Sequence, residues 1–138
     1  MRRDLWMRIM LAGLAWSALL VGAWATFAPR SFYDSFPGGG ETWVAVDGPY
    51  NQHLVGDVGA LNLALVVVTV WALVTLDRRL VQVASVAWLV YSVPHLSYHS
   101  THRDPYETGS LVAALTSLAP TCTCNIENSS CARIGFAR

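Results

Sequence analysis

Histidine and aspartate side chains near the ends of two predicted helices are the residues of this sequence that could do chemistry. His95, His99 and His102 are spaced i, i+4 and i+7, which places them on one face of a helix. His53 and Asp57 are spaced i, i+4 in the same way. Imidazole and carboxylate groups bind divalent metals, and histidine also titrates near neutral pH. The spacing therefore predicts either a metal site with these five residues as candidate ligands, or a proton-responsive polar site.

A purely structural role for the same residues is the competing interpretation. Polar and ionisable side chains gather at membrane surfaces because they reach water there, and an Asp–His hydrogen bond can serve only to hold two helices together. No cysteine or glutamate lies at zinc-motif spacing with the histidines, and a haem held by two histidines would need one inside each of two helices. We favour the structural interpretation, so the sequence predicts no catalytic residue and no cofactor.

Apolar helices must position these residues. Val58 to Leu76 has no charged side chain, and as a helix its nineteen residues cover ~28 Å, close to the ~30 Å hydrocarbon thickness of a bilayer. The sequence predicts helices over about 6–28, 54–76, 80–98 and 108–119, with an external loop over 29–53. The last helix covers only ~18 Å before Pro120. The predicted fold class is an all-α, polytopic transmembrane helical bundle of three helices plus a short or truncated fourth.

Composition supports a membrane protein of one domain. Charged residues make up 13% of the chain and apolar residues 54%, and the formal net charge is zero, so no basic surface is expected to bind nucleic acid. The predicted bundle covers residues 1–120. Residues 121–138 lack a hydrophobic period, which predicts either a disordered tail or the loss of a native helix end. This tail contains three cysteines, Cys122, Cys124 and Cys131. They could bind a soft metal, but we expect them to have no function.

The arginines predict the orientation in the membrane. Arg2, Arg3 and Arg8 precede the first apolar stretch, and Arg78 and Arg79 follow the second, so these ends should lie in the cytoplasm. We expect a multi-pass protein of the plasma membrane with a cytoplasmic N-terminus and all four histidines external. A cleaved signal peptide is the alternative for residues 1–28, but the apolar run of twenty residues favours an uncleaved helix.

A tight turn at residues 77–79 makes the second and third helices an antiparallel hairpin. If the turn is centred on Arg78, Asp57 lies level with His99 and Asn62 level with His95. We therefore expect a carboxylate and an imidazole to meet at the outer end. The predicted polar mouth consists of Asn51, Asp57, Asn62, Tyr91, His95 and His99.

The first predicted helix also carries an interaction face. Ala18, Gly22 and Thr26 are spaced by four, so small residues line one side, where another helix could approach closely.

Three segments carry a resemblance to known proteins: SFYDSFPGGGETWV, DGPYNQHLVGDVGALNLAL and AWLVYSVPHLSYH. They resemble a group of small actinobacterial membrane proteins with four predicted helices, and the layout is more distantly similar to the DoxX-like superfamily. The resemblance covers about residues 5–115. It implies a four-helix membrane bundle without a shared set of catalytic residues. Members of the group often have an arginine before the aspartate, where this chain has Gly56.

The sequence as a whole indicates a non-enzymatic role. We expect a structural or interaction component of the plasma membrane, whose partners are the lipid bilayer and other membrane proteins or a second copy of itself. The alternative is a small-ligand or metal-binding membrane subunit of a redox system, with its polar site at the outer mouth. The sequence does not identify the ligand, the oligomeric state or the physiological role.

Overall fold

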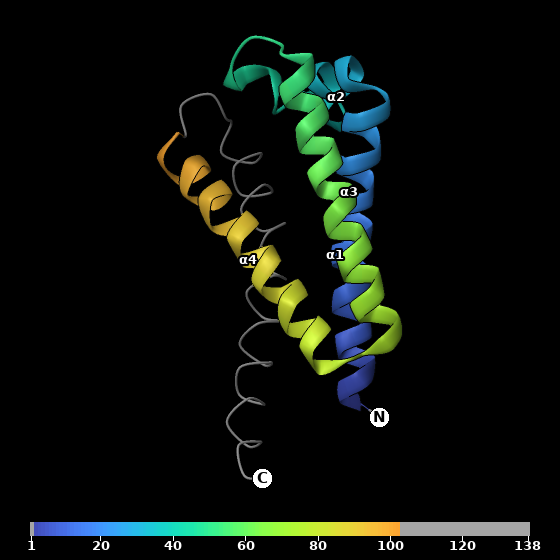
Figure 1. The fold of residues 1–138 in the computed structure, drawn as a ribbon. Helices are drawn as coiled ribbons and strands as arrows, with labels where there is room; N and C mark the ends of the chain where they lie inside the picture. Colours follow the sequence, from blue (N-terminus) through green and yellow to red (C-terminus); the bar gives the residue numbers. More distant parts are fainter. Residues whose placement is uncertain (1, 103–138) are drawn as a thin grey trace.

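The computed structural model describes residues 2–102, which form three long helices and a small cap. The long helices are α1 (Arg2–Phe27), α3 (Gln52–Thr75) and α4 (Arg78–Thr101). The N-terminus and the α3–α4 turn lie at the same end of the molecule, which we call the turn end, and the cap lies at the opposite end (Figure 1). The prediction of an all-α bundle with antiparallel helices is confirmed. The predicted helix 108–119 and tail 121–138 lie outside the described residues.

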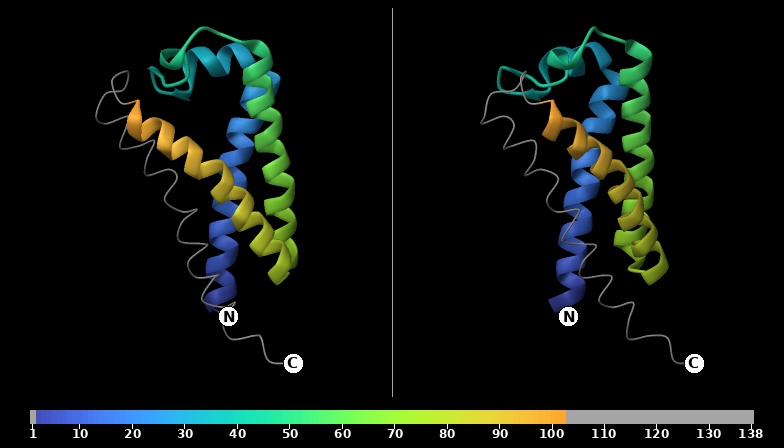
Figure 2. Two further views of the ribbon diagram at one scale, coloured as in Figure 1. Left: turned by 60° about the vertical axis from the view of Figure 1, so that its left-hand side comes forward. Right: turned by 90° about the vertical axis from the view of Figure 1, so that its left-hand side faces the viewer.

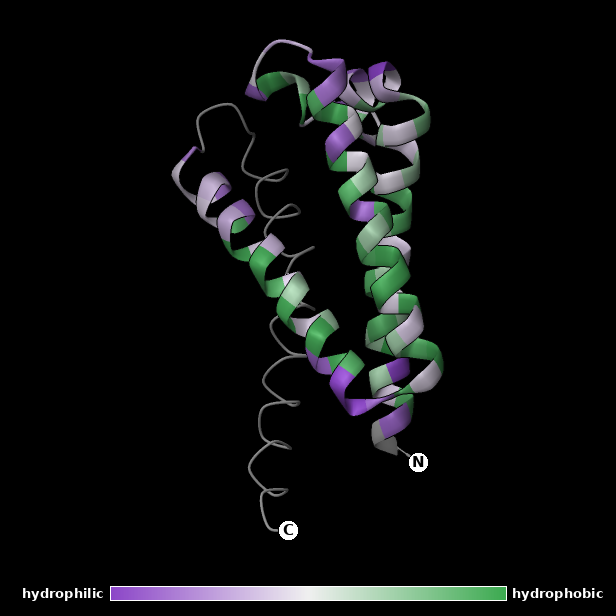
Figure 3. Ribbon diagram, viewed as in Figure 1, coloured by the Kyte–Doolittle hydropathy of each residue, from purple (hydrophilic) through white to green (hydrophobic). Residues whose placement is uncertain are grey.

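All three long helices are long and apolar enough to cross a membrane. Each candidate span has 24 residues, or roughly 36 Å of helix. Figure 3 shows apolar residues along the middle of each helix and polar residues at the α3–α4 turn and toward the cap end of α4. Helix α4 is the least apolar of the three. Its polar side chains would be unfavourable against lipid, so they are expected to face protein or water.

Local capping fixes where α3 and α4 begin and end. The Asn51 side chain accepts a hydrogen bond from the Leu54 amide at 3.1 Å and so caps the start of α3. Leu76 ends the helix in a left-handed conformation with a φ of 50°. The Asp77 carboxylate then accepts hydrogen bonds from the amides of Arg79 and Leu80 and caps α4. A tight turn joins the two helices as predicted, but it consists of Leu76 and Asp77 and not of residues 77–79, because α4 already begins at Arg78.

Close packing joins α1 to α3. Gly22 lies against Leu63, where a Cβ atom would be 3.0 Å from the Leu63 backbone. A Cβ atom on Gly59 would overlap the Thr26 hydroxyl and the backbone of α1. Ala18 is also buried on this face. The predicted face of small residues on the first helix is therefore the interface with α3, because only such residues let the two backbones approach this closely.

Residues 29–50 form an ordered cap where the sequence predicted a loop over 29–53. The cap contains α2 (Pro29–Ser35), a short antiparallel pair of β1 (Pro37–Gly38) with β2 (Glu41–Thr42), and η1 (Ala45–Asp47). Pro29 stands at the first position of α2, where its missing amide hydrogen costs nothing. Phe32 is only 4% exposed and packs with Ala25 of α1 and Val55 of α3. The loop prediction failed because aromatic residues typical of a membrane interface pack here as a small core.

The third long helix, α4, contacts the α1–α3 pair mainly through its turn-end half. One apolar cluster contains Leu11, Ala72, Val81 and Ala84, and a second contains Leu14, Ala18 and Trp88. From the turn onward the ribbon of α4 diverges from α3, so that its far end lies away from α1 and α3 (Figures 1 and 2). In both views of Figure 2, the cap extends from the ends of α1 and α3 toward the far end of α4.

Candidate functional site

A column of aromatic and imidazole rings runs along the cap-end half of α4. Tyr91 contacts Trp88 edge to face at 5.9 Å between ring centroids and stacks on His95 at 5.6 Å. The His95 and His99 rings lie 4.7 Å apart. We call Tyr91, His95 and His99 the α4 column. Its members follow one face of the helix because they are four residues apart, and the spacing of His95 and His99 predicted this correctly.

His102 does not join the α4 column. Its ring stacks on Tyr98 at 4.3 Å, and its Nδ1 lies 3.2 Å from the Tyr98 carbonyl oxygen and 3.0 Å from the Thr101 hydroxyl. The spacing i, i+4, i+7 placed three histidines on one face, but His102 is the residue that ends α4, where the backbone leaves helical geometry. The structure therefore brings together two of the three.

His53 and Asp57 pair with each other on α3. Their side chains lie 3.4 Å apart and are 89% and 55% exposed. The predicted contact between Asp57 and His99 does not form, because the cap-end halves of α3 and α4 lie apart (Figure 2). Two residues equally far from the turn along α3 and α4 lie at similar depth, but they touch only where the two helices are packed together. A carboxylate from a different element has an electrostatic effect on the α4 column.

Asp47 of η1 supplies that carboxylate, and sequence reasoning missed it. Its negative charge acts on His95, as does the neighbouring imidazole of His99. The acidic character of residues 29–57 was visible in the sequence, but no spacing rule connects a cap residue with α4. Only the tertiary arrangement of the cap and α4 gives Asp47 this electrostatic effect on His95.

The two asparagines of the predicted polar mouth serve other purposes. Asn51 caps α3, as described above. Asn62 is 2% exposed inside the bundle, and its side-chain amide donates to the Val58 carbonyl at 2.9 Å. Among the described residues, no three histidine, cysteine, aspartate or glutamate side chains gather closely enough to hold a metal ion. The predicted mouth thus divides into Asn51 as a helix cap, Asp57 paired within α3, Asn62 buried in the bundle, and the α4 column.

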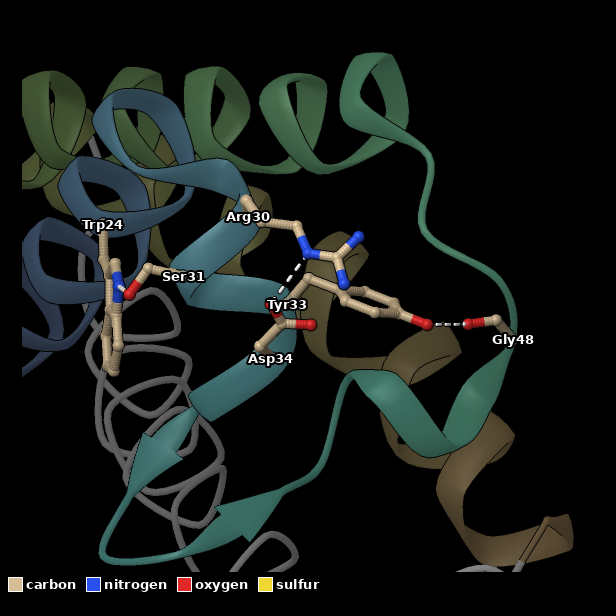
Figure 4. A network of polar contacts seen from close by, with 6 residues as sticks. All are labelled: Trp24, Arg30, Ser31, Tyr33, Asp34 and Gly48. Carbon is tan, nitrogen blue, oxygen red and sulfur yellow. Dashed lines mark hydrogen bonds and ion pairs between the residues drawn. The ribbon is translucent and has the colours of Figure 1, made fainter.

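The cap itself is held by a polar and aromatic network (Figure 4). Arg30 donates to Asp34 at 2.7 Å and lies over the Tyr50 ring at 4.9 Å, while the Tyr33 hydroxyl donates to the Gly48 carbonyl at 2.5 Å. The hydrogen bond to Asp34, and secondarily its charge, raises the pKa of Arg30. The guanidinium is therefore occupied within the cap, and this network fixes the cap's shape.

A hydrogen bond inside the bundle links α3 and α4. The Trp88 indole N–H donates to Thr69 Oγ1 at 2.9 Å, and the Thr69 hydroxyl donates to the Leu65 carbonyl at 2.6 Å. Both side chains are buried. Trp88 therefore both packs in the apolar core and joins the two helices through its indole N–H. Thr69 could have indicated this link from the sequence, because a buried hydroxyl group in an apolar helix is normally hydrogen-bonded.

No protein-family model matches this chain, and no curated protein or solved structure shows significant similarity to it.

Proposed function

We propose that this protein is a non-catalytic component of the plasma membrane that works by binding another membrane protein through the cap-end half of α4. One observation carries the proposal. The part of α4 that leans away from the α1–α3 pair exposes His95, Ser97 and Tyr98, which are polar. These residues belong to a helix that is long and apolar enough to span a bilayer.

The depth of these side chains supports a protein partner over lipid. At ~1.5 Å per residue, His95 lies roughly 26 Å along α4 from Arg78, and the lean of α4 makes its depth less. His95 therefore falls within a hydrocarbon layer of ~30 Å if the turn end marks the opposite surface. Lipid chains cannot hydrogen-bond imidazole or hydroxyl groups, whereas a neighbouring helix can.

The arrangement of charge supports a cytoplasmic turn end. Arg8, Arg78 and Arg79 lie at this end, and Arg8 donates to the Leu73 carbonyl at 2.9 Å near the end of α3. The cap at the other end carries Asp34, Glu41 and Asp47. Positive charge collects on the cytoplasmic side of membrane proteins, so the cap and the α4 column would face outward.

Photo-crosslinking in native membranes tests the proposed role. A photoreactive amino acid replaces Ser97 on α4 in one variant and Val67 on α3 in a control, because Val67 is 64% exposed on an apolar face. We expect a protein adduct of one defined mass from position 97, reduced by Tyr98→Leu, and lipid adducts alone from position 67. Equal adducts at both positions, or lipid alone at position 97, would contradict the proposal.

A second candidate function is a small-ligand site in a redox-linked membrane subunit. The His95 and His99 rings favour it, because two imidazoles with ring centroids 4.7 Å apart at the cap end form a polar group to which a ligand could bind. Metal analysis and a visible absorption spectrum of the purified full chain test this candidate. Stoichiometric metal, or an absorption band from a bound chromophore, would favour it over partner binding.

A further inference from the structure

Pro94 lies inside α4, is exposed, and has no backbone N–H. In a regular helix the amide of residue 94 would donate to the Val90 carbonyl, four residues earlier. Pro94 cannot make this bond. However the remaining amides are shared, this turn of α4 has one backbone donor fewer than it has carbonyl acceptors. The Val90 carbonyl is therefore an acceptor whose donor must come from outside the helix backbone.

This carbonyl belongs to an exposed and apolar side of α4, which we call the valine face and which consists of Val83, Val86, Val90 and Val93. Each of these valines is more than half exposed. They follow one another at intervals of three, four and three residues, so they lie along one side of the helix, and Ser97 continues the series. The other helices described here leave this side of α4 uncovered.

The depth of the Val90 carbonyl excludes an easy partner. Val90 is twelve residues from Arg78, or ~18 Å along α4. Since α4 is long and apolar enough to span a bilayer, this position falls near the middle of the ~30 Å hydrocarbon layer. Lipid chains have no group that can donate to a carbonyl. Membrane helices contain proline where a neighbouring helix, a serine or threonine side chain or a water molecule supplies the missing donor.

A second copy of this chain does not fit the valine face. Copies with the same orientation in a membrane are related by an axis along the membrane normal, so a symmetric contact through this face sets Val90 against Val90. The residues of the face within one turn are Val86, Val93 and Pro94, which carry no side-chain donor. The carbonyl would thus stay unpaired in both copies.

We propose that the valine face binds a transmembrane helix of a different protein, and that a serine, threonine or asparagine side chain of this helix donates a hydrogen bond to the carbonyl that Pro94 leaves free. The valines supply the packing surface, and small polar side chains of this kind join helices in membranes. Pro94 acts by exposing an acceptor in an otherwise apolar face. This inference rests on the proposed function, because it describes the chemistry of the proposed partner.

Binding of designed transmembrane peptides to the full chain in phosphatidylcholine vesicles tests the hydrogen bond. One peptide is a leucine–alanine helix with a single central serine, and the control peptide has alanine in its place. Energy transfer from a dye on the peptide to a dye on Val46→Cys, with the native cysteines changed to serine, gives each dissociation constant. Both peptides are measured with Pro94 and with Pro94→Ala, whose restored amide pairs the Val90 carbonyl within α4.

We expect the serine peptide to bind the Pro94 protein about threefold to tenfold more tightly than the alanine peptide, and to lose this preference in Pro94→Ala. A straighter α4 in the variant would affect both peptides alike, so the double comparison isolates the hydrogen bond. Equal affinities of the two peptides for the Pro94 protein would overturn the inference. So would a preference that Pro94→Ala leaves unchanged. Neither result bears on partner binding itself.

Photo-crosslinking in native membranes tests the natural partner. A photoreactive amino acid at Val93 should give an adduct that mass spectrometry identifies as a transmembrane segment of another protein, with serine, threonine or asparagine within one turn of the crosslink. A segment without such a side chain, or a crosslink within one chain or between two copies, would overturn this inference alone. Lipid adducts alone at both Val93 and Ser97 would overturn the proposed function and this inference with it.

Discussion

The indole of Trp88 donates a hydrogen bond to the hydroxyl of Thr69 at 2.9 Å, at a level where both side chains are buried between α3 and α4. The bond places a large side chain between the two helices. It also satisfies the indole N–H, which has no water to bond with there. The relationship matters for stability, because it joins two helices whose ribbons diverge from the turn toward the other end of the molecule (Figure 1).

Thr69→Val should lower the free energy of unfolding by ~1–3 kcal/mol, because it leaves the buried Trp88 N–H without an acceptor. Unfolding in mixed micelles by added denaturing detergent measures the change. Thr75→Val is the matched control, since Thr75 also donates to the carbonyl four residues earlier but is exposed near the turn. Similar losses for both variants would show that the link between helices contributes nothing of its own.

Gly59→Ala should destabilise the protein by ~1–3 kcal/mol, because the new methyl group would overlap Thr26 and the backbone of α1. The same unfolding assay measures it. Gly56→Ala, three residues away, has nothing within 4 Å of the added atom and should be neutral or slightly stabilising. If Gly59→Ala proved as harmless as Gly56→Ala, the tight α1–α3 interface would be wrong.

Phe32→Ala should cost ~3–5 kcal/mol by leaving a cavity between the cap and the α1–α3 pair. Phe27→Ala is the comparison, because Phe27 is close in sequence but 80% exposed. Limited proteolysis of residues 29–50 gives a second readout, and faster cleavage is expected in the Phe32 variant alone. An unchanged cleavage rate would mean that the cap does not depend on this core.

Asp57→Asn should change the free energy of unfolding by less than ~0.5 kcal/mol, because an exposed ion pair within one helix contributes little. Measurement in detergent at neutral pH is sufficient. A loss above ~1 kcal/mol would indicate a buried partner for Asp57 and would restore the pairing with His99 that the sequence predicted.

Cysteine labelling tests the orientation. Val46→Cys in the exposed part of the cap should react with a membrane-impermeant maleimide added to intact cells, and Arg78→Cys at the turn should react only after the cells are opened. Both variants are made with the native cysteines changed to serine. Labelling of position 78 in intact cells would reverse the proposed topology.

The sequence determined those features that depend on residues close together along the chain. Uninterrupted apolar length set the three spans, Asn51 and Asp77 set helix starts through local caps, and the short polar turn made α3 and α4 antiparallel. The spacing of Ala18, Gly22 and Thr26 identified a packing face, and the spacing of His95 and His99 identified a ring contact. Each of these follows from helical periodicity.

Only the tertiary structure decided which helices stay together and which separate. Small residues such as Gly22 and Gly59 let α1 and α3 touch, whereas the rings of Trp88 and Tyr91 stand between α4 and that pair. The difference in side-chain size accounts for the lean of α4, and with it the separation of Asp57 from His99. Such outcomes depend on packing between distant segments, which no spacing along the chain specifies.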